Sequence, residues 1–204
     1  MKKGLIIIAV AANLVSVSTA LAQLSLNSAS VNAGTIRTLF PNDSRYTDFQ
    51  YAFYPEVQVD GDFLTSFVRW TVYWGYWSDG VENALPIADM VTYSYSSHIV
   101  GARFSFLPAK LLDHWPIPVG IFAGTAHHFI AARYVGGFGL DGKPGHDFTA
   151  DATTVEVGLN AQVQVFGPID LRGEIQQFIP LGSDYFDRLQ KNRRAYKVGL
   201  AFTF

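Results

Sequence analysis

The sequence predicts an all-β protein, namely a transmembrane, antiparallel, up-and-down β-barrel of eight strands. Three observations lead to this fold class. The chain begins with the layout of a secretory signal peptide. Several later segments alternate apolar with small or polar residues, which is typical of half-buried strands. Hydrophobic residues make up 49% of the chain and charged residues only 16%, yet no apolar run after the signal peptide approaches the roughly 20 residues that a membrane helix needs.

The signal peptide is predicted from three adjoining regions. Met1-Lys2-Lys3 supplies the basic start, an apolar run follows from Leu5 to Val17, and Ala20-Leu21-Ala22 supplies the small residues of a cleavage site. We therefore expect residues 1–22 to be the signal peptide and residues 23–204 to be the barrel domain. The chain has no cysteine, which excludes a lipoprotein anchor, disulfides and thiolate metal sites.

The charge balance gives no support to a nucleic-acid partner. The chain has 17 acidic and 15 basic residues, and two of the basic ones, Lys2 and Lys3, belong to the signal peptide. A nucleic-acid-binding domain would instead show a basic patch or a high isoelectric point.

Three strands are predicted in the first part of the chain, at residues 24–33, 51–59 and 63–77. The first is rich in Ser and Asn and is expected because a strand must meet the last one to close the sheet. Asp60-Gly61-Asp62 is predicted to be a tight turn between the second and the third strand. The alternation places Glu56 on the inward face of the second strand.

The two middle strands, 90–107 and 118–134, have a less regular pattern. Tyr93 and Tyr95 occupy odd positions, whereas Val100 and the apolar residues after it occupy even ones. A β-bulge between residues 96 and 99 would reconcile the two halves. The alternation of residues 118–134 is poor, so the facing of this strand stays open.

The last three strands are predicted at 152–165, 169–180 and 194–204, with a turn at Phe166-Gly167-Pro168 between the first two. Period-two alternation is clearest in the final strand, where the apolar face consists of Tyr196, Val198, Leu200, Phe202 and Phe204. A soluble β-sandwich could contain any one such strand. The combination of several strands with a signal peptide favours a membrane barrel.

The final strand, with an aromatic or aliphatic residue at every second position and Phe204 at its end, resembles the terminal strand of Gram-negative outer-membrane barrels. Along its mature length the chain resembles small outer-membrane proteins of the OmpA transmembrane-domain and OmpX type. The resemblance implies an integral, monomeric outer-membrane protein whose last strand is read by the barrel assembly machinery. An even strand count agrees with this family.

The connections predict which end of the barrel faces the periplasm. Residues 60–62, 108–117 and 166–168 would connect strands there, whereas the longer segments 34–50, 78–89, 135–151 and 181–193 would form extracellular loops. This arrangement places both termini in the periplasm. Aromatic residues are expected in girdles at both interfaces. The outer girdle would hold Trp74, Tyr76, Trp77, Tyr93, Tyr95 and Tyr134, and the periplasmic one Phe104, Phe106, Trp115, Phe202 and Phe204.

The lumen of an eight-stranded barrel is only wide enough for side chains. The alternation points a set of charged residues inward: Glu56, Arg69, Glu156, Asp170, Arg172, Glu174 and Lys197, together with Arg103 and Arg133 if the bulge and the open facing are as expected. Because both signs are present, these residues can neutralise one another, which predicts a plugged lumen. A narrow solute path is the alternative.

A catalytic site was considered because some small outer-membrane barrels modify lipids. The candidates are Ser96, Ser97 and His98 on one strand, His127 and His128 on its neighbour, and an inward carboxylate, Glu56 or Glu156. No motif resembles the lipid A deacylases or palmitoyltransferases. Adjacent histidines on a strand point to opposite faces, which disfavours a metal site. We therefore expect neither an enzyme nor a metal or cofactor.

Four cations in and beside the last predicted loop are candidates for contact with lipopolysaccharide phosphates: Arg188, Lys191, Arg193 and Arg194. Asp184 and Asp187 lie in the same loop, so ordinary solvated loop charge is the alternative.

The leading hypothesis is a non-enzymatic outer-membrane barrel that is structural or binds an unidentified extracellular ligand through its loops, in contact with outer-membrane lipid and lipopolysaccharide. The alternatives are a narrow channel for small solutes or apolar compounds, as in the OmpW type, and a lipid A modifying enzyme.

Overall fold

The computed structural model describes residues 25–38, 50–63, 65–78, 85–87, 91–108, 119–138, 143–181 and 193–204. These residues form nine strands: β1 (Ser28–Thr38), β2 (Gln50–Phe63), β3 (Thr65–Ser78), β4 (Leu85–Ile87), β5 (Val91–Phe106), β6 (Val119–Gly136), β7 (Phe148–Phe166), β8 (Ile169–Pro180) and β9 (Arg193–Thr203). The described residues contain no helix that is long and apolar enough to cross a membrane.

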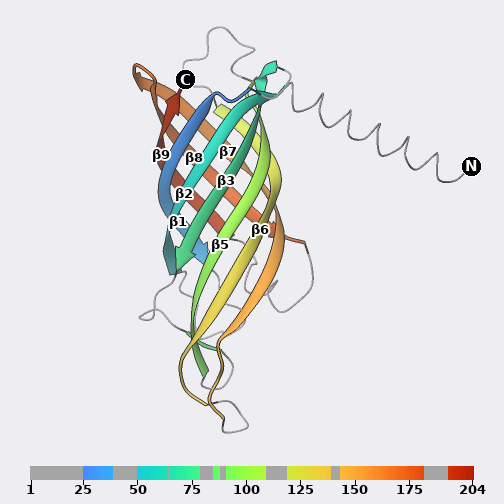
Figure 1. Cartoon of the computed structure of the whole chain (residues 1–204), viewed down its shortest axis with the longest axis vertical. Helices are drawn as coiled ribbons and strands as arrows, with labels where there is room; N and C mark the ends of the chain where they lie inside the picture. The colour runs from blue at the N-terminus through green and yellow to red at the C-terminus, as the bar shows by residue number, and fades with distance from the viewer. Residues whose placement is uncertain are drawn as a thin grey trace, which may run out of the picture.

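Eight of these strands close into an antiparallel barrel (Figure 1). The first strand, β1, pairs with β2 on one side and with the last strand, β9, on the other. The ring is completed by pairing of β3 with β5, while the short β4 pairs only with the start of β5 in the described part of the chain. The predicted eight-stranded, closed, antiparallel barrel is therefore confirmed.

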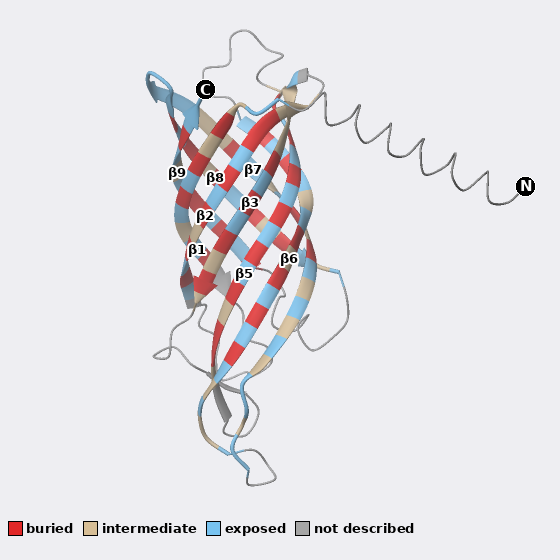
Figure 2. Cartoon of the chain, viewed as in Figure 1, coloured by how far each residue is buried: buried red, intermediate tan, exposed pale blue. Residues whose placement is uncertain are grey.

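Buried and exposed residues alternate along the strands (Figure 2). In β9, for example, Ala195 and Lys197 are buried whereas Tyr196 and Val198 are exposed. The outward positions of most strands carry large apolar side chains, and the inward positions include many charged and polar ones. This distribution is the reverse of that in a soluble protein and fits a barrel surrounded by lipid.

The predicted turn at residues 60–62 is wrong, because β2 continues through them to Phe63. Asp60 pairs with Thr71 and Asp62 with Arg69 across β2 and β3, and the register shifts only after Asp62. The Asp60 side chain is fully buried and accepts hydrogen bonds from Arg172 and Thr71. An ion pair in the lumen therefore outweighs the turn preference of Asp-Gly-Asp.

The predicted bulge between residues 96 and 99 is also wrong. The register of β5 with β3 runs without interruption from Ser96 to Phe106, and the irregularity in its pairing with β6 lies between Thr92 and Tyr93. Tyr95 consequently points into the barrel. Trp77 is buried there as well, so neither residue belongs to the predicted outer girdle, whereas Trp74 is exposed on the outer face.

The first strand lies further along the chain than predicted, at Ser28–Thr38. Gly34, expected to start a loop, is paired inside the strand with Lys197. A side chain at this position would collide with the backbone oxygen of Tyr196, so the glycine allows close approach of β1 and β9. This position is an example of glycine serving sheet packing rather than a turn.

The two ends of the barrel differ. At one end, β7 and β8 are joined by the two-residue turn Gly167-Pro168, with a positive φ at Gly167, and the C-terminus lies at this same end (Figure 1). At the opposite end, β6 and β7 extend beyond the ring, and Phe138 bridges Pro144 between them. Much of the predicted loops 34–50, 78–89 and 181–193, together with Trp115, lies outside the described residues.

Candidate functional site

A group of six charged side chains fills the middle of the barrel and is called the lumen cluster below. It consists of three acids and three cations from β2, β5, β8 and β9: Glu56, Asp60, Glu174, Arg103, Arg172 and Lys197. All six are buried. Each reaches the interior because it occupies an inward position of its strand, and the opposite charges balance in number.

Glu174 is the centre of the lumen cluster. Its carboxylate accepts hydrogen bonds from Nη2 of Arg103 at 2.7 Å, from Nε of Arg172 at 2.8 Å and from Nζ of Lys197 at 2.7 Å. The two arginines and the lysine come from three different strands. One acid of β8 therefore ties β5 and β9 together across the lumen.

The other two acids each share one of these cations with Glu174. Nζ of Lys197 lies 2.7 Å from Oε1 of Glu56, and Nη1 of Arg172 lies 2.6 Å from Oδ2 of Asp60. The hydroxyl of Tyr54 also donates to Glu56, at 2.7 Å. Buried charges with this many partners are compensated, whereas removal of a single partner would leave a charge unpaired.

Aromatic rings border the lumen cluster. The guanidinium of Arg103 lies 4.4 Å from the ring centroid of Phe122 and 5.0 Å from that of Tyr73. Both distances are within the range of cation–π attraction. The rings therefore contribute to holding Arg103 in place while they fill space around it.

Glu156 is buried but takes no part in the ion pairs of the lumen cluster, since no cation of the described residues lies within 4.0 Å of it. Tyr73 donates to its Oε2 at 2.8 Å, and Gln176 donates to the same oxygen. Its Oε1 is buried without a hydrogen-bond partner in the described part of the chain. The sequence placed Glu156 inside the barrel but could not show that it lacks a cation.

Arg69 and Asp170 lie nearer the end of the barrel that carries the β7–β8 turn. Nη1 of Arg69 donates to Gln162 at 2.7 Å, and Gln162 donates in turn to Asp170 at 2.5 Å. Thr203 also donates to Asp170, at 2.8 Å. Both charged residues therefore lie at the mouth of the barrel and are not members of the lumen cluster.

Arg133 is not a lumen residue, which corrects the prediction. The inward positions of β6 are even-numbered, with His128, Ile130 and Ala132 buried, so that Arg133 is exposed on the outer face. The register supports this facing, because Ile130 pairs with Ser97 and both of these side chains are buried. The weak alternation of this segment gave no means of choosing between the two faces.

An apolar cluster fills the lumen at the end opposite the β7–β8 turn and is called the apolar chamber below. Its members are Ile36, Ala52, Tyr54, Tyr73, Trp77, Tyr95, Ile99, Ala126, Ile130, Ala132, Phe178 and Ala195. The sequence pattern does not predict this chamber, because several strands carry apolar residues on both faces. The available signal was the presence of aromatic residues at inward positions of residues 63–77.

The serine and histidine candidates do not form a catalytic group among the described residues. His128 is buried and shares a hydrogen bond with Thr154, whereas His127 faces outward and contacts Thr153. His98 faces outward as well, where its ring stacks on Trp74. The hydroxyl of Ser97 points to the backbone oxygen of His98. Glu56 and Glu156 are engaged by the partners described above.

The described residues contain no group of three or more His, Asp or Glu side chains arranged to hold a metal ion.

The four cations predicted to contact lipopolysaccharide divide into three cases. Arg188 and Lys191 lie outside the described residues. Arg193 is buried with its guanidinium 4.7 Å from the ring centroid of Trp77, which contradicts an exposed role. Arg194 is exposed and donates from Nε to Gln177 at 2.8 Å.

The apolar face of β9 is directed away from the lumen. Tyr196, Val198, Leu200, Phe202 and Phe204 are all exposed there, and β9 is held by β8 on one side and β1 on the other. Their position is the one expected for side chains that contact lipid. Whether the assembly machinery reads this strand stays a prediction.

Comparison with known proteins identifies the fold. No protein-family model matches the chain, and no curated protein sequence matches it. Among solved structures, a major outer membrane protein of Thermus thermophilus is similar with a TM-score of 0.56, 12% identity and coverage of 87% of this chain and 99% of that one.

Two other solved structures are similar at lower scores. The N-terminal β-barrel domain of Pseudomonas aeruginosa OprF has a TM-score of 0.48 and 15% identity, with coverage of 87% and 98%. Ail of Yersinia pestis has a TM-score of 0.49 and 10% identity, with coverage of 88% and 100%. The closed ring of strands and the match to the Thermus thermophilus protein show that the chain has the fold of a small outer-membrane β-barrel.

Proposed function

We propose that this protein is a non-enzymatic, monomeric barrel of the Gram-negative outer membrane, closed to solutes, which supports the membrane or binds partners through its long loops. The observation that carries this proposal is that two different fillings occupy the lumen. Buried charged side chains of the lumen cluster occupy the middle, and the packed side chains of the apolar chamber occupy the end opposite the β7–β8 turn.

The outer surface supports residence in lipid. Large apolar side chains at outward positions include Phe53, Phe104, Ile121, Leu159 and Leu200. A sheet edge in hydrocarbon would leave unpaired backbone groups, and closure of the ring between β1 and β9 removes that edge.

Ion pairing supports a closed lumen. Each member of the lumen cluster is held by at least one opposite charge within 2.8 Å. A solute or hydrated ion that passed through would have to separate these pairs and then displace the packed rings of the apolar chamber. Either step requires rearrangement of the interior.

Planar-bilayer conductance tests the closed lumen. Purified protein, shown to be folded by the difference in gel mobility between unheated and boiled samples, is expected to give no discrete openings. Reproducible openings of defined size would overturn the closed lumen and favour the narrow channel.

Lipid A from expressing cells is expected to have the same mass spectrum as lipid A from cells without the protein, and a changed mass would contradict a non-enzymatic role.

The proposed orientation places both termini and the β7–β8 turn in the periplasm. Because the chain has no cysteine, a single introduced thiol reports on one position only. A membrane-impermeant maleimide is expected to label Phe138→Cys on intact cells and to label Pro168→Cys only after the outer membrane is permeabilised. The opposite pattern would reverse the orientation.

Three further proposals concern processing, assembly and the cell surface. The mature protein is expected to begin at Gln23, which N-terminal sequencing determines. Deletion of Phe204 should slow assembly in cells while purified protein still refolds, which would separate recognition by the assembly machinery from stability.

Arg188, Lys191 and Arg194 remain candidates for contact with lipopolysaccharide phosphates, and substitution of all three by Gln should weaken lipopolysaccharide binding. Substitution of the outward-facing Arg133 is the matched control.

A further inference from the structure

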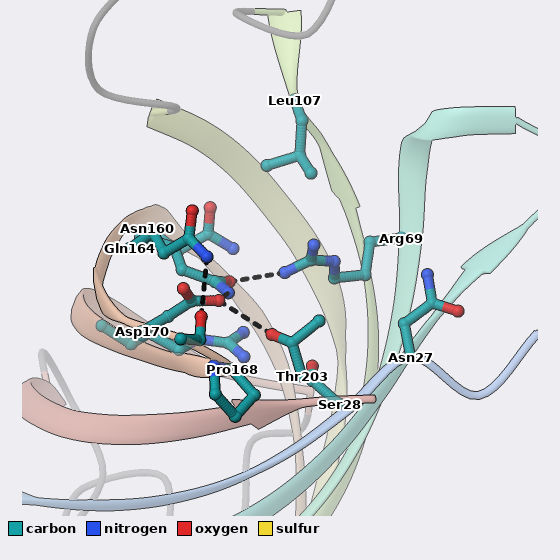
Figure 3. A pocket seen from close by; sticks show the side chains of 12 residues that line it. Asn27, Ser28, Arg69, Leu107, Asn160, Gln164, Pro168, Asp170 and Thr203 are labelled. Carbon is teal, nitrogen blue, oxygen red and sulfur yellow. Dashed lines mark hydrogen bonds between the residues drawn. The ribbon is translucent and has the colours of Figure 1, made fainter.

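A polar cavity of about 420 Å³ opens at the end of the barrel that carries the β7–β8 turn, and it is called the vestibule below (Figure 3). Its walls are made by the start of the first barrel strand, the β7–β8 turn and the inward residues next to them. The lining residues that carry the argument are Arg69, Gln162, Asp170, Arg172 and Thr203. Arg172 of the lumen cluster also lines the cavity, so with the proposed closed lumen the vestibule is a recess and not part of a path.

Two arginines in the vestibule have unused donors. Arg172 donates from Nε to Glu174 and from Nη1 to Asp60, but its Nη2 is buried without an acceptor in the described part of the chain. Arg69 donates from Nη1 to Gln162, while its Nε is likewise buried without an acceptor. A guanidinium has its donors in a planar fork that matches oxyanions. Both arginines line the vestibule, so an oxyanion toward which their guanidinium groups turn would supply the missing acceptors.

Asp170 places an acid beside these cations without neutralising them. Gln162 lies between the two charges, accepting from Arg69 and donating to Asp170, and Figure 3 labels Arg69 and Asp170 among the residues that line the vestibule. Thr203 donates to the same Asp170 oxygen, Oδ2. No described donor reaches Oδ1, and no described cation lies within 4.0 Å of Asp170. The vestibule therefore offers a cation and a separate acceptor to the same ligand.

We propose that the vestibule binds a small oxyanion that keeps a proton, with inorganic phosphate as the best match. The phosphate oxygens accept hydrogen bonds from Arg69 and Arg172, and the remaining P–O–H group donates to Asp170. Sulfate has the same shape but no proton near neutral pH, so it meets the Asp170 carboxylate without a hydrogen bond. This binding site goes beyond the proposed structural role and does not require the lumen to conduct.

The site would be coupled to the stability of the barrel. Arg172 belongs both to the vestibule and to the lumen cluster, since it pairs with Asp60 and Glu174. A ligand that binds the folded barrel and not the unfolded chain raises the apparent stability by RT ln(1 + [L]/Kd), so the tighter-binding ion stabilises more at equal concentration. Phosphate should therefore raise the urea midpoint of unfolding more than sulfate does at equal ionic strength.

The test is calorimetric titration of the refolded, full mature protein in detergent micelles with phosphate and, separately, with sulfate. Loss of one charge-assisted hydrogen bond should weaken binding by about tenfold to a hundredfold. Phosphate is thus expected to bind more tightly than sulfate by that factor, and Arg69→Gln should weaken phosphate binding similarly. Arg133→Gln is the matched control, because Arg133 lies on the outer face.

Asp170→Asn separates this proposal from general attraction of anions. An amide can donate to sulfate, so the variant should lose the preference for phosphate and gain affinity for sulfate. Equal binding of both ions by the parent protein, unchanged binding by Arg69→Gln, or no binding at all would overturn the proposal. Glycerol 3-phosphate represents a lipid headgroup, and tighter binding of this ester than of inorganic phosphate would overturn assignment to the free ion.

Discussion

The apolar chamber and the lumen cluster lie in the same barrel but are held together by different chemistry. The apolar chamber contains rings and aliphatic side chains such as Trp77, Ile99 and Phe178, and its cohesion comes from packing. The lumen cluster contains acids and cations within hydrogen-bond distance of one another, and its cohesion comes from charge pairing.

The difference shows that the side chains that fill the lumen are not all the ones that determine which face of each strand turns inward. Apolar side chains are equally acceptable to lipid and to the apolar chamber, so they do not by themselves determine which face of a strand turns inward. A charged side chain on the lipid face costs about 2–4 kcal/mol at the midplane for Arg or Lys. The lumen cluster therefore fixes strand facing, while the apolar chamber fills the space that remains.

The largest expected effect is at the centre of the lumen cluster. Glu174→Gln leaves Arg103, Arg172 and Lys197 with fewer charges to pair with, and breaking a buried pair in this way costs about 3–5 kcal/mol of unfolding free energy. Urea unfolding of the refolded protein, followed by gel mobility, measures the loss. Asp151→Asn, on an exposed acid, should have little effect, and equal stability of the two variants would contradict the central role of Glu174.

Two neighbouring residues of β5 test the apolar chamber. Ile99 is buried within it, whereas Val100 is exposed on the outer face. Ile99→Ala should cost about 2–5 kcal/mol because it leaves a cavity, whereas lipid can fill the space left by Val100→Ala. The same unfolding measurement compares them. A larger loss for Val100→Ala would mean that lipid contacts contribute more than packing inside the chamber.

The same contrast explains what the sequence could predict. The fold followed from alternation, and β7, β8 and β9 lie close to their predicted bounds because each has one apolar and one polar face. Around Tyr95 the apolar residues lie on the inward face, because they belong to the apolar chamber, so the expectation that the apolar face contacts lipid gives the wrong direction. The expected bulge was therefore assigned to a strand that has a continuous register with β3.

The site was predicted where charge marked the inward face and missed where local signals suggested something else. Glu56, Glu174 and Lys197 are inward residues of clearly alternating strands, and the structure brings them together. Asp60 was assigned to a turn because Asp-Gly-Asp is a turn sequence. Its true position depends on Arg172, which is 112 residues away in the chain, and such a contact has no local signature.

A double-mutant cycle sharpens the contrast at one pair. Glu56→Gln and Lys197→Met each remove one partner of an ion pair whose atoms lie 2.7 Å apart. Because the pair is buried, the coupling free energy should fall within about 0.5–3 kcal/mol, the range found for residues in contact. Unfolding midpoints of the parent, both single variants and the double variant give this value. Additive losses would show that the two residues stabilise the barrel independently.

The smallest expected effect is that of salt on the lumen cluster. Mobile ions screen exposed charges strongly but reach buried pairs much less, and the side chains of Arg103, Glu174, Glu56 and Lys197 have no exposed surface in their ion pairs. Raising the ionic strength from roughly 0.05 to 1 M should therefore change the coupling free energy between Glu56 and Lys197 by less than about 0.5 kcal/mol. Exposed ion pairs, in contrast, contribute no more than about 1 kcal/mol in total and lose most of that contribution in high salt. The double-mutant cycle repeated at both ionic strengths measures this change. A coupling that disappears in high salt would mean that water and ions enter the middle of the lumen, and the closed barrel would then have to be abandoned together with the assignment of strand facing to buried charge.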